Sequence, residues 1–353
     1  MPALTTVEAE EGDVMNAKAR RKVLMGVHHL GDRAIPFIRR MEEAGLEVIC
    51  NPHKRWYTED ELIAVLPGVF ATFASVEPYT DRVFRKARDL QIVARYGVGY
   101  DKIDVAAATR HGVMIAMAFG TNHEAVADSA FTLMAAVAQR TVTHHLRVKE
   151  GGWGLDIHPG LWRMTVGIIG LGRIGKAMAR RCPGFEMRVL AHDIRPDIAF
   201  ARANGVELVS LEKLLRESDV VTLHIPHTLE TDNFMNRDRF GLMKPTSYLI
   251  NTSRGGVVDE EALHEALTSG KIAGAGLDVF KKEPPKGSPL LNLDNVIFSP
   301  HSAGSNLTSE ATVANRCVDS ILAVARGKSP GEEYLLNPEV LRAGQGRMSG
   351  RQA

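Results

Sequence analysis

The stretch GIIGLGRIGKAMARR, residues 167–181, decides the fold. It follows an apolar run that reads as a strand, contains a G-x-G-x-x-G pattern and opens a helical pattern, which is the context of a dinucleotide-binding turn. The first glycine permits a tight turn, the second lets the backbone approach a pyrophosphate, and the third lets the helix pack on the strand. The free N–H groups at the start of the helix favour the phosphates. The cofactor-binding candidates in this turn are Gly170, Gly172, Arg173, Ile174 and Gly175.

An acidic residue ends the next predicted strand. Asp193 closes the run MRVLAHD, about 20 residues beyond the last glycine, the spacing at which an acid binds the ribose hydroxyls of the cofactor. An acid there also repels a 2′-phosphate, so NAD is predicted in preference to NADP, although Arg195 would partly offset the repulsion. The alternative is an ordinary tight turn followed by a strand-end aspartate. The strand, turn and helix in sequence favour the cofactor.

Length and composition exclude several classes of protein. The chain has 353 residues, about twice an ordinary domain, which predicts two domains. Its 43 lysines and arginines balance 42 acidic residues, so the net charge predicts neither nucleic acid nor a membrane surface as a partner. Residues 1–20 lack a signal peptide's apolar core and are expected to form a mobile leader. Three widely spaced cysteines predict neither a disulfide nor a metal site and fit the cytoplasm: Cys50, Cys182 and Cys317.

Short apolar runs alternate with amphipathic helical patterns along the chain, which predicts an α/β fold with parallel sheets covered by helices. In the first half the predicted strands are 22–27, 46–50, 69–75, 90–95 and 113–117. In the second half they are 164–170, 187–193, 219–225, 247–251, 272–279 and 295–299. Long helical patterns at 122–149 and 308–326 are candidate crossings between domains. If both are crossings, the second domain is inserted into the first, which then holds a substrate.

Charged residues follow several of the second set of strands, where ligands bind in open α/β sheets. Arg254 comes just after strand 247–251 and can hold a carboxylate with two hydrogen bonds, while the two glycines after it permit a close backbone approach. Asp278, Glu283 and His301 also lie beyond strand ends. A histidine near a carboxylate is the usual proton-transfer pair. Taken singly, each has a plainer interpretation: a surface arginine, a solvated glutamate or a structural loop histidine.

Six segments together resemble the NAD-dependent D-2-hydroxyacid dehydrogenase family, nearest its D-3-phosphoglycerate dehydrogenase-like branch. They are YGVGYDKID (96–104), GIIGLGRIGKAMA (167–179), LHIPHTLET (223–231), NTSRGGVVDEEAL (251–263), AGLDVFKKEPP (275–285) and SPHSAG (299–304). The resemblance covers about residues 22–330 in the family's order. It implies two doubly wound parallel-sheet domains, with a Rossmann-type NAD-binding domain inserted into a flavodoxin-like substrate domain. The implied ranges are 122–302 for the NAD domain, 21–121 with 303–335 for the substrate domain, and 336–353 for a tail.

The same resemblance assigns roles to residues. Arg254, Glu283 and His301 match the catalytic arginine, glutamate and histidine; His301 would exchange a proton with the substrate's C2 oxygen as hydride passes between C2 and the nicotinamide ring. Asp278 matches the acid that holds the nicotinamide amide, and Val98 with Gly99 matches the loop that receives the substrate carboxylate. The remaining residues implied to line the cofactor are His224, Pro226, Thr231 and Thr252. The helix from 122 and the GGW…LW region resemble the family's dimer-forming segment, so a homodimer is expected.

One departure bears on the substrate. Phosphoglycerate dehydrogenases typically have an arginine for the substrate phosphate directly before the serine that matches Ser75, whereas this chain has Ala74. Glu77 adds an acid nearby, so a phosphate would be poorly held there unless Arg95 or another residue reaches it. An unphosphorylated acid such as glyoxylate or hydroxypyruvate is therefore expected. The alternatives are D-3-phosphoglycerate dehydrogenase and, from another class, an NADH-sensing protein like the corepressors of the same superfamily.

Overall fold

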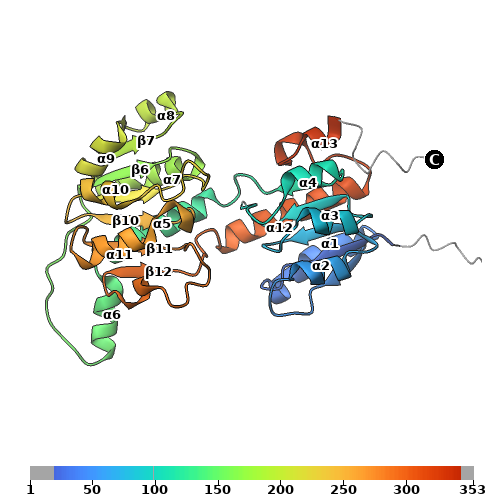
Figure 1. Ribbon diagram of the computed structural model, residues 1–353, viewed down its shortest axis with the longest axis horizontal. Helices are drawn as coiled ribbons and strands as arrows, with labels where there is room; N and C mark the ends of the chain where they lie inside the picture. Colours follow the sequence, from blue (N-terminus) through green and yellow to red (C-terminus); the bar gives the residue numbers. More distant parts are fainter. Residues whose placement is uncertain (1–19, 98, 343–353) are drawn as a thin grey trace, which may run out of the picture. The chain divides into compact units, whose positions relative to one another are not determined.

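The computed structural model describes residues 20–97 and 99–342, and the chain forms two compact units. Among these residues, the first unit runs up to Ala118 and resumes at Ala314, while Phe119–Val313 forms the second. Helix α12 (Leu307–Ala325) carries the chain from the second unit back into the first (Figure 1). Only the last residue of the expected leader, 1–20, falls within the described residues. The inserted arrangement predicted from the sequence is confirmed.

The first unit contains a five-stranded parallel sheet in the order β2-β1-β3-β4-β5. Its strands are β1 (Lys22–Met25), β2 (Glu47–Cys50), β3 (Val69–Ala74), β4 (Ile92–Arg95) and β5 (Met114–Met117). Helices lie between them: α1 (Ile35–Glu43) after the short 3-10 helix η1 (Gly31–Ala34), then α2 (Glu59–Val65), α3 (Asp81–Lys86) and α4 (Val105–Arg110). This strand order is the flavodoxin-like one, as predicted.

Local signals start these helices where the sequence changes from apolar to polar. Thr58 and Glu61 form a reciprocal capping box at the start of α2, in which the Thr58 hydroxyl accepts from the Glu61 amide. The side chains of Thr80 and Asp104 cap α3 and α4 by accepting from the amides of Val83 and Ala107. Strand β3 is buried along its whole length, as the inner strand of a doubly wound sheet should be.

The segment after α12 covers the exposed edge of β5. It contains η5 (Glu332–Tyr334) and α13 (Glu339–Arg342). Asn337 is fully buried; its Oδ1 accepts from the Ile115 amide at 2.9 Å and its Nδ2 donates to the Val113 carbonyl at 2.9 Å. Residues 336–342, expected to belong to a tail, therefore pair with a sheet edge that would otherwise be unsatisfied. The rest of that expected tail, 343–353, lies outside the described residues.

The second unit contains a seven-stranded parallel sheet in the order β12-β11-β10-β9-β6-β7-β8. Its strands are β6 (Thr165–Ile169), β7 (Arg188–His192), β8 (Val206–Leu208), β9 (Val220–Leu223), β10 (Tyr248–Asn251), β11 (Gly274–Leu277) and β12 (Val296–Phe298). From β8 to β11 this is the Rossmann order, with β12 added at the far edge. Each predicted strand contains an observed one. Only β8 was missed, because it has a single buried residue, Val206, and no apolar run.

Helices cover both faces of this sheet. They are α5 (His123–Ala138), α6 (Thr141–Lys149), α7 (Arg173–Arg181), η2 (Cys182–Phe185), α8 (Ile198–Ala203), α9 (Leu211–Glu217), α10 (Arg237–Leu242), η3 (Gly255–Val257), α11 (Glu260–Thr268) and η4 (Pro289–Asn292). One core joins the sheet to α9, α10 and α11, and the other joins it to α5, α7 and α8. This is the doubly wound layering predicted from the sequence (Figure 1).

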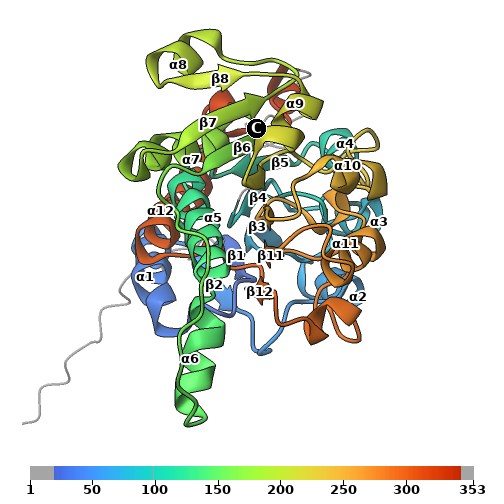
Figure 2. The same ribbon diagram turned by 90° about the vertical axis from the view of Figure 1, so that its left-hand side faces the viewer.

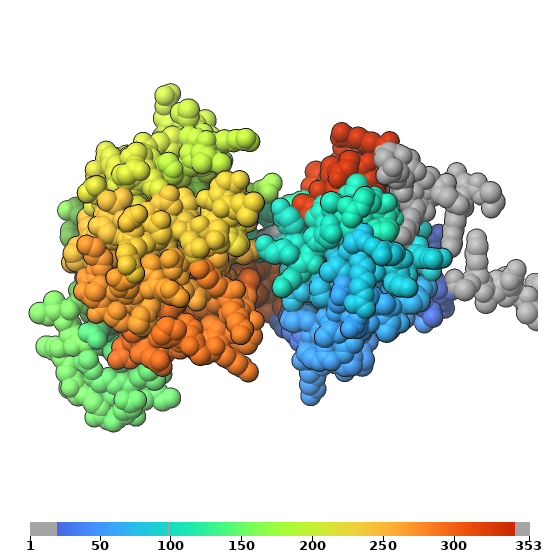
Figure 3. Space-filling view, in the orientation of Figure 1, coloured from blue at the N-terminus to red at the C-terminus, as the bar shows by residue number. Residues whose placement is uncertain are grey.

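The helical pattern at 122–149 forms two helices rather than one. The chain turns at Arg140, whose φ of 50° is left-handed. Helix α5 buries its small and apolar residues against β10 and β11, whereas α6 buries none. Figure 2 shows α6 beyond the end of α5, and Figure 3 shows the same green segment projecting from the body of the second unit. No helix among the described residues is long and apolar enough to cross a membrane.

Candidate active site

The glycine turn after β6 has the geometry that the sequence predicted. Gly170 has a φ of 96°, and a Cβ there would lie 2.5 Å from the carbonyl oxygen of His224. A Cβ at Gly175 would overlap the Gly170 carbonyl. A Cβ at Gly172, just before α7, would meet no protein atom within 4 Å. The protein's own packing therefore explains the first and third glycines, whereas the space beside the second is open to a ligand.

Asp193 is fixed at the end of β7. Its Oδ2 accepts from the Leu171 amide at 2.7 Å, and its Oδ1 accepts from the Arg195 amide at 2.7 Å. Each carboxylate oxygen keeps a second lone pair for a hydroxyl. The Arg195 backbone thus orients the acid, while Arg195 itself is exposed. This arrangement fits the ribose of NAD.

Two of the predicted cofactor-lining residues carry buried polar atoms that have no hydrogen-bond partner within residues 20–97 and 99–342. These atoms are Nδ1 of His224 and Oγ1 of Thr252. Burial lowers the pKa of His224 to about 3, so the ring is neutral, and its Nε2 lies 3.0 Å from the Thr222 hydroxyl. Buried polar atoms in proteins have partners as a rule, so these two atoms are open to a ligand's polar groups.

The predicted residues Pro226 and Thr231 close the loop after β9 on itself. The Thr231 hydroxyl donates to the Pro226 carbonyl at 2.7 Å and accepts from the Thr228 amide at 2.7 Å. The loop is exposed along 226–230. Its backbone is thereby held at the carboxyl end of β9, beside the strand that carries the glycine turn.

The turn that carries Arg254 is held from two sides. Asn251, buried at the end of β10, donates through Nδ2 to the Arg254 carbonyl at 2.9 Å and accepts through Oδ1 from the Ser253 amide at 3.0 Å. A Cβ at Gly255 would overlap the backbone at Phe280, just after β11. The two strand-end loops therefore pack backbone to backbone. Sequence analysis did not single out Asn251; its position at the strand end was the available signal.

Glu283 and His301 form the predicted pair. His301 Nδ1 lies 2.7 Å from Glu283 Oε2, and Glu283 Oε1 accepts from the Phe280 amide at 3.1 Å. Burial opposes ionisation of Glu283, but these hydrogen bonds and the charge of Arg254 outweigh it and hold the pKa of Glu283 below its ordinary value. Arg254, Glu283 and His301 thus lie at the carboxyl ends of β10, β11 and β12. One sheet edge can therefore combine an arginine that binds an anion with a proton donor.

Asp278 holds the loop that carries His301. It is fully buried, and its carboxylate accepts from the Ser299 hydroxyl at 2.6 Å, the Ser302 amide at 2.9 Å and the Ala303 amide at 3.0 Å. Its carbonyl accepts from the His301 amide at 2.8 Å. His301 has a left-handed φ of 51°, which the surrounding bonds must hold in place. The sequence predicted Asp278 as a cofactor residue and missed this anchoring.

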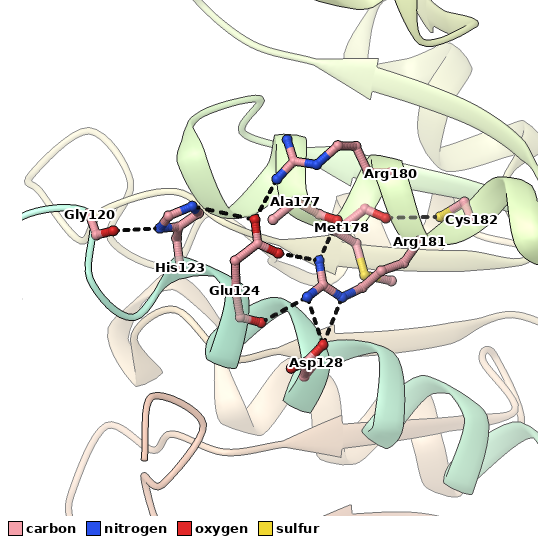
Figure 4. Close-up of polar contacts among 9 residues, drawn as sticks. All are labelled: Gly120, His123, Glu124, Asp128, Ala177, Met178, Arg180, Arg181 and Cys182. Atoms are coloured by element: carbon pink, nitrogen blue, oxygen red, sulfur yellow. Dashed lines mark hydrogen bonds and ion pairs between the residues drawn. The ribbon is translucent and has the colours of Figure 1, made fainter. Parts of the chain in front are cut away.

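A cluster of ion pairs joins the fingerprint helix α7 to α5 (Figure 4). Glu124 lies between Arg180 and Arg181, with nitrogen–oxygen distances of 2.5 and 2.8 Å. Arg181 also reaches Asp128 at 2.6 Å. His123, which precedes the acid, makes a 2.8 Å hydrogen bond to the Gly120 carbonyl. The helix behind the glycine turn is therefore tied to the first helix of its own unit.

The first unit holds the remaining predicted residues. Gly99 is among the described residues, whereas Val98 is not. Glu77 is almost fully buried, accepts from the Ser75 amide at 2.6 Å, and has its pKa raised by burial. Arg95 is only 8% exposed, donates to the Tyr96 carbonyl and lies beside the Gly97 backbone. No group of three or more potential metal ligands occurs in residues 20–97 or 99–342.

Comparisons with known proteins agree with this arrangement. Residues 131–303 match the family described as D-isomer specific 2-hydroxyacid dehydrogenase, NAD binding domain. A glyoxylate reductase of Korarchaeum cryptofilum is 44% identical over 273 residues, 75% of this chain and 82% of that protein. A glyoxylate reductase of Pyrococcus furiosus is 39% identical over 322 residues, 88% and 95% of the two chains.

A third relative and one solved structure extend the comparison. A D-3-phosphoglycerate dehydrogenase of Archaeoglobus fulgidus is 40% identical over 304 residues, which cover 84% of this chain but 56% of that protein. The structure of Aquifex aeolicus D-lactate dehydrogenase, complexed with NAD and lactic acid, superposes with a TM-score of 0.79. The two chains are 28% identical, with 90% of this chain and 99% of the other covered.

Proposed function

This chain belongs to the D-isomer specific 2-hydroxyacid dehydrogenase family, and on that premise we propose that it reduces a small, unphosphorylated 2-keto acid with NADH. The observation that carries the proposal is the 2.7 Å contact between His301 and Glu283 on the same sheet edge as Arg254. A proton donor beside an anion clamp is what reduction of a keto acid requires. Glyoxylate and hydroxypyruvate are the first substrates to try.

Three sets of residues would hold NAD. The glycine turn receives the pyrophosphate, Asp193 accepts from the ribose hydroxyls, and the unpartnered atoms of His224 and Thr252 face the remaining polar groups. NADH, when bound, supplies the hydride. We keep Asp278 as a candidate for the nicotinamide amide, because its carboxylate retains an acceptor position besides the three bonds to the His301 loop.

His301 supplies the proton. Glu283 occupies its Nδ1 side, so the transferable proton sits on Nε2. In reduction, the C2 carbonyl carbon gains a hydride, its oxygen gains the Nε2 proton, and the imidazolium becomes neutral. The Glu283 carboxylate stabilises the imidazolium before transfer. In the reverse direction the neutral ring removes the proton from the C2 hydroxyl.

Arg254 binds the substrate and stabilises developing charge. Its planar guanidinium matches a carboxylate with two parallel hydrogen bonds. Placed near the C2 oxygen, it also stabilises the negative charge that builds there as hydride arrives. Asn251 holds the turn through two hydrogen bonds, so the Arg254 guanidinium needs little rearrangement during the reaction. On the first unit, the backbone at 98–99 is our candidate for the other contact with the substrate carboxylate.

The choice of an unphosphorylated substrate rests on the end of β3. Ala74 is fully buried where a phosphate-binding arginine would be expected, and Glu77 behind it is a buried acid. Two of the relatives named above are glyoxylate reductases that match along most of their length. Both observations favour glyoxylate-type acids over 3-phosphohydroxypyruvate.

We also propose that the protein is a homodimer. The segment around α6 exposes large apolar side chains that a monomer would leave in water: Trp153 is 91% exposed, Leu155 102% and Ile157 103%. Contiguous apolar exposure of this kind marks a protein interface. The mass in solution tests the proposal: a dimer supports it, and a monomer at micromolar concentration overturns it.

We place the enzyme in the cytoplasm. All three cysteines are unpaired thiols, with Cys182 and Cys317 buried. Free thiols persist where the compartment is reducing. Fractionation of cells that produce the protein checks this, and recovery in a secreted or membrane fraction would contradict it.

Turnover against a panel of acids tests the function. Purified protein is assayed for NADH and NADPH oxidation with glyoxylate, hydroxypyruvate, pyruvate, longer 2-keto acids and 3-phosphohydroxypyruvate. We expect NADH oxidation with an unphosphorylated acid. Turnover with 3-phosphohydroxypyruvate alone would show that another residue holds phosphate. Tight NADH binding with no turnover would instead favour a nucleotide sensor.

A further inference from the structure

The loop that follows β9 lies against the turn that carries Arg254. The Asn233 amide donates to the Gly256 carbonyl at 2.8 Å, and the Met235 amide donates to the Val257 carbonyl at 2.9 Å. Both acceptors come just after Arg254 in the chain. The loop therefore contacts the backbone from which the arginine projects, and all of these residues belong to the second unit.

The two glycines after Arg254 face this loop and one other. A Cβ at Gly256 would lie 2.5 Å from Cε1 and Nε2 of His227, so the imidazole ring lies directly against the glycine. A Cβ at Gly255 would overlap the backbone of Phe280. The close approach that the glycines permit is thus to protein in both cases, and the turn packs against two loops.

A carboxylate holds the imidazole ring in this position. Asp232 Oδ1 lies 2.8 Å from His227 Nε2, and Asp232 Oδ2 accepts from Asn233 Nδ2 at 2.9 Å. Asn233 has a left-handed φ of 50°, and its Oδ1 accepts from the Lys281 ammonium. These bonds join the ring to the loop after β11. The ring leaves the glycine only if its bond to Asp232 breaks.

The pair of His227 and Asp232 adds little to the stability of the fold. Their side chains are 39% and 50% exposed, and pairs exposed to this extent contribute little to the free energy of unfolding. The turn is anchored in the core by Val257 and Val258, which are buried. The ring therefore fixes the short stretch of backbone between Arg254 and this core.

We propose that His227 is a positioning residue for Arg254: its ring, held by Asp232, fixes the turn and with it the direction of the guanidinium. The inference rests on the proposed function, in which Arg254 binds the substrate carboxylate. A guanidinium makes two parallel hydrogen bonds to a carboxylate only when the two planes are aligned. Displacement of the turn should therefore lower kcat/KM for every 2-keto acid by the same factor.

Complementary substitutions at positions 227 and 256 test the contact. Gly256→Ala places a methyl group where the ring lies, and His227→Ala removes the ring, so each should lower kcat/KM for glyoxylate about 10-fold. In the double variant the methyl group occupies the space that the ring vacates, and kcat/KM should exceed that of Gly256→Ala alone by about threefold or more. Independent effects would multiply to about a 100-fold loss, which would overturn the contact.

A second pair of variants tests whether His227 acts through Arg254. In an Arg254→Lys background, His227→Ala should cause a further loss of about twofold or less, because the planar group that the ring positions is already gone. A full further loss of about 10-fold would overturn the positioning role. If Arg254→Lys alone keeps near-normal turnover, the proposed role of Arg254 fails first, whatever the result at position 227.

Further measurements separate positioning from a general structural effect. The Kd for NADH should stay unchanged in every variant, and a Kd that weakens in step with kcat/KM would overturn the role. Asp232→Ala releases the ring without removing it and should show a smaller loss, even if His227→Ala does not fold. The controls are Gly241→Ala, where a Cβ meets no atom within 4 Å, and His264→Ala on α11. Normal kcat/KM in both His227→Ala and Asp232→Ala would overturn the proposal.

Discussion

The carboxyl edges of the two sheets are built differently. On the seven-stranded sheet, polar side chains are bonded to one another and to backbone: Asp278 accepts three hydrogen bonds, and Glu283 bridges His301 and the Phe280 amide. On the five-stranded sheet aromatic rings meet at this edge, and Nδ1 of His28 and Oε1 of Glu77 have no hydrogen-bond partner among the described residues. The first edge is thus fixed by hydrogen bonds, whereas the second is held by ring contacts.

This difference has a physical basis. Proton and hydride transfer require atoms held to fractions of an ångström, and fixed hydrogen bonds provide that. Selecting a substituent requires a shaped surface with an unsatisfied donor or acceptor, because the ligand itself completes the bond. Damage to the first edge should therefore reduce turnover on every substrate.

The largest expected loss follows removal of the proton donor. His301→Asn should lower kcat for glyoxylate reduction by about 10²–10⁴-fold, the usual contribution of general acid catalysis, and leave the Kd for NADH unchanged. Steady-state kinetics and fluorescence titration measure the two quantities. His264→Asn, on α11, is the matched control. A His301 variant within threefold of wild-type turnover would place the proton donor elsewhere.

Arg254→Lys should come next. Lysine keeps the charge but loses the planar fork, so kcat/KM should fall by about 10²–10³-fold for glyoxylate and hydroxypyruvate alike. An equal loss on both substrates supports this role, because Arg254 acts on the carboxylate that both substrates share. Near-normal kcat/KM would rule out this role for Arg254. A loss confined to one substrate would mean that Arg254 contacts the part of the substrate that differs, rather than the shared carboxylate.

Asp278→Asn probes the anchor of the catalytic loop. The amide cannot accept from three donors as the carboxylate does, and leaving one buried donor unpaired costs about 1–3 kcal/mol of the free energy of unfolding. Denaturant titration measures this loss, and kcat should fall with it while NADH affinity holds. Ser288→Ala, whose buried hydroxyl has no partner among the described residues, is the control and should change neither quantity. A weakened NADH affinity at normal stability would instead favour contact with the nicotinamide amide.

Glu283→Gln should change the pH dependence of reduction. The pKa of Glu283 is held below its ordinary value, so its carboxylate is ionised at neutral pH and interacts favourably with a protonated His301. Removing that charge makes protonation of the ring harder, so the alkaline limb of kcat/KM should move to lower pH by roughly one unit, equal to about 1.4 kcal/mol. The pH profile with glyoxylate measures it. An unmoved limb, or a move to higher pH, contradicts the pairing.

The smallest effect concerns the ion pairs behind the glycine turn. Arg181→Ala removes contacts to Glu124 and Asp128 that are partly exposed to solvent, so the free energy of unfolding should drop by about 1 kcal/mol or less. Thermal melting with and without NADH measures this. Arg180→Ala, which loses one contact, should cost less. A larger loss than that of Asp278→Asn would mean that α7 depends on this cluster more than on its buried face.

The sequence identified the carboxyl edge of the seven-stranded sheet more fully than that of the five-stranded sheet. The glycine turn, Asp193 and the residues Arg254, Glu283 and His301 stand out because each follows an apolar run that predicts a strand. Strand β8 could not be found, because its one buried residue leaves no apolar pattern. Asn251 forms its side-chain bonds within its own turn. The bonds of Asp278 reach Ser299, Ser302 and Ala303, more than 20 residues later, and no local pattern links them.

The aromatic contact between His28 and Trp56 was harder to predict, because the two rings also come from loops distant in sequence. His28 and Trp56 are separated by a helix and a strand, and no spacing rule links them. Asn337 likewise pairs with β5, more than 200 residues earlier in the chain. Local patterns predict elements and strand ends, whereas contacts between strand ends depend on the strand order, which only the folded sheet reveals.

The identity and configuration of the product test the account most directly. Hydroxypyruvate and NADH are incubated with the enzyme, and the glycerate formed is separated by chiral chromatography. We expect one equivalent of D-glycerate for each NADH oxidised. L-glycerate, a racemic product, or NADH oxidation without glycerate would contradict it.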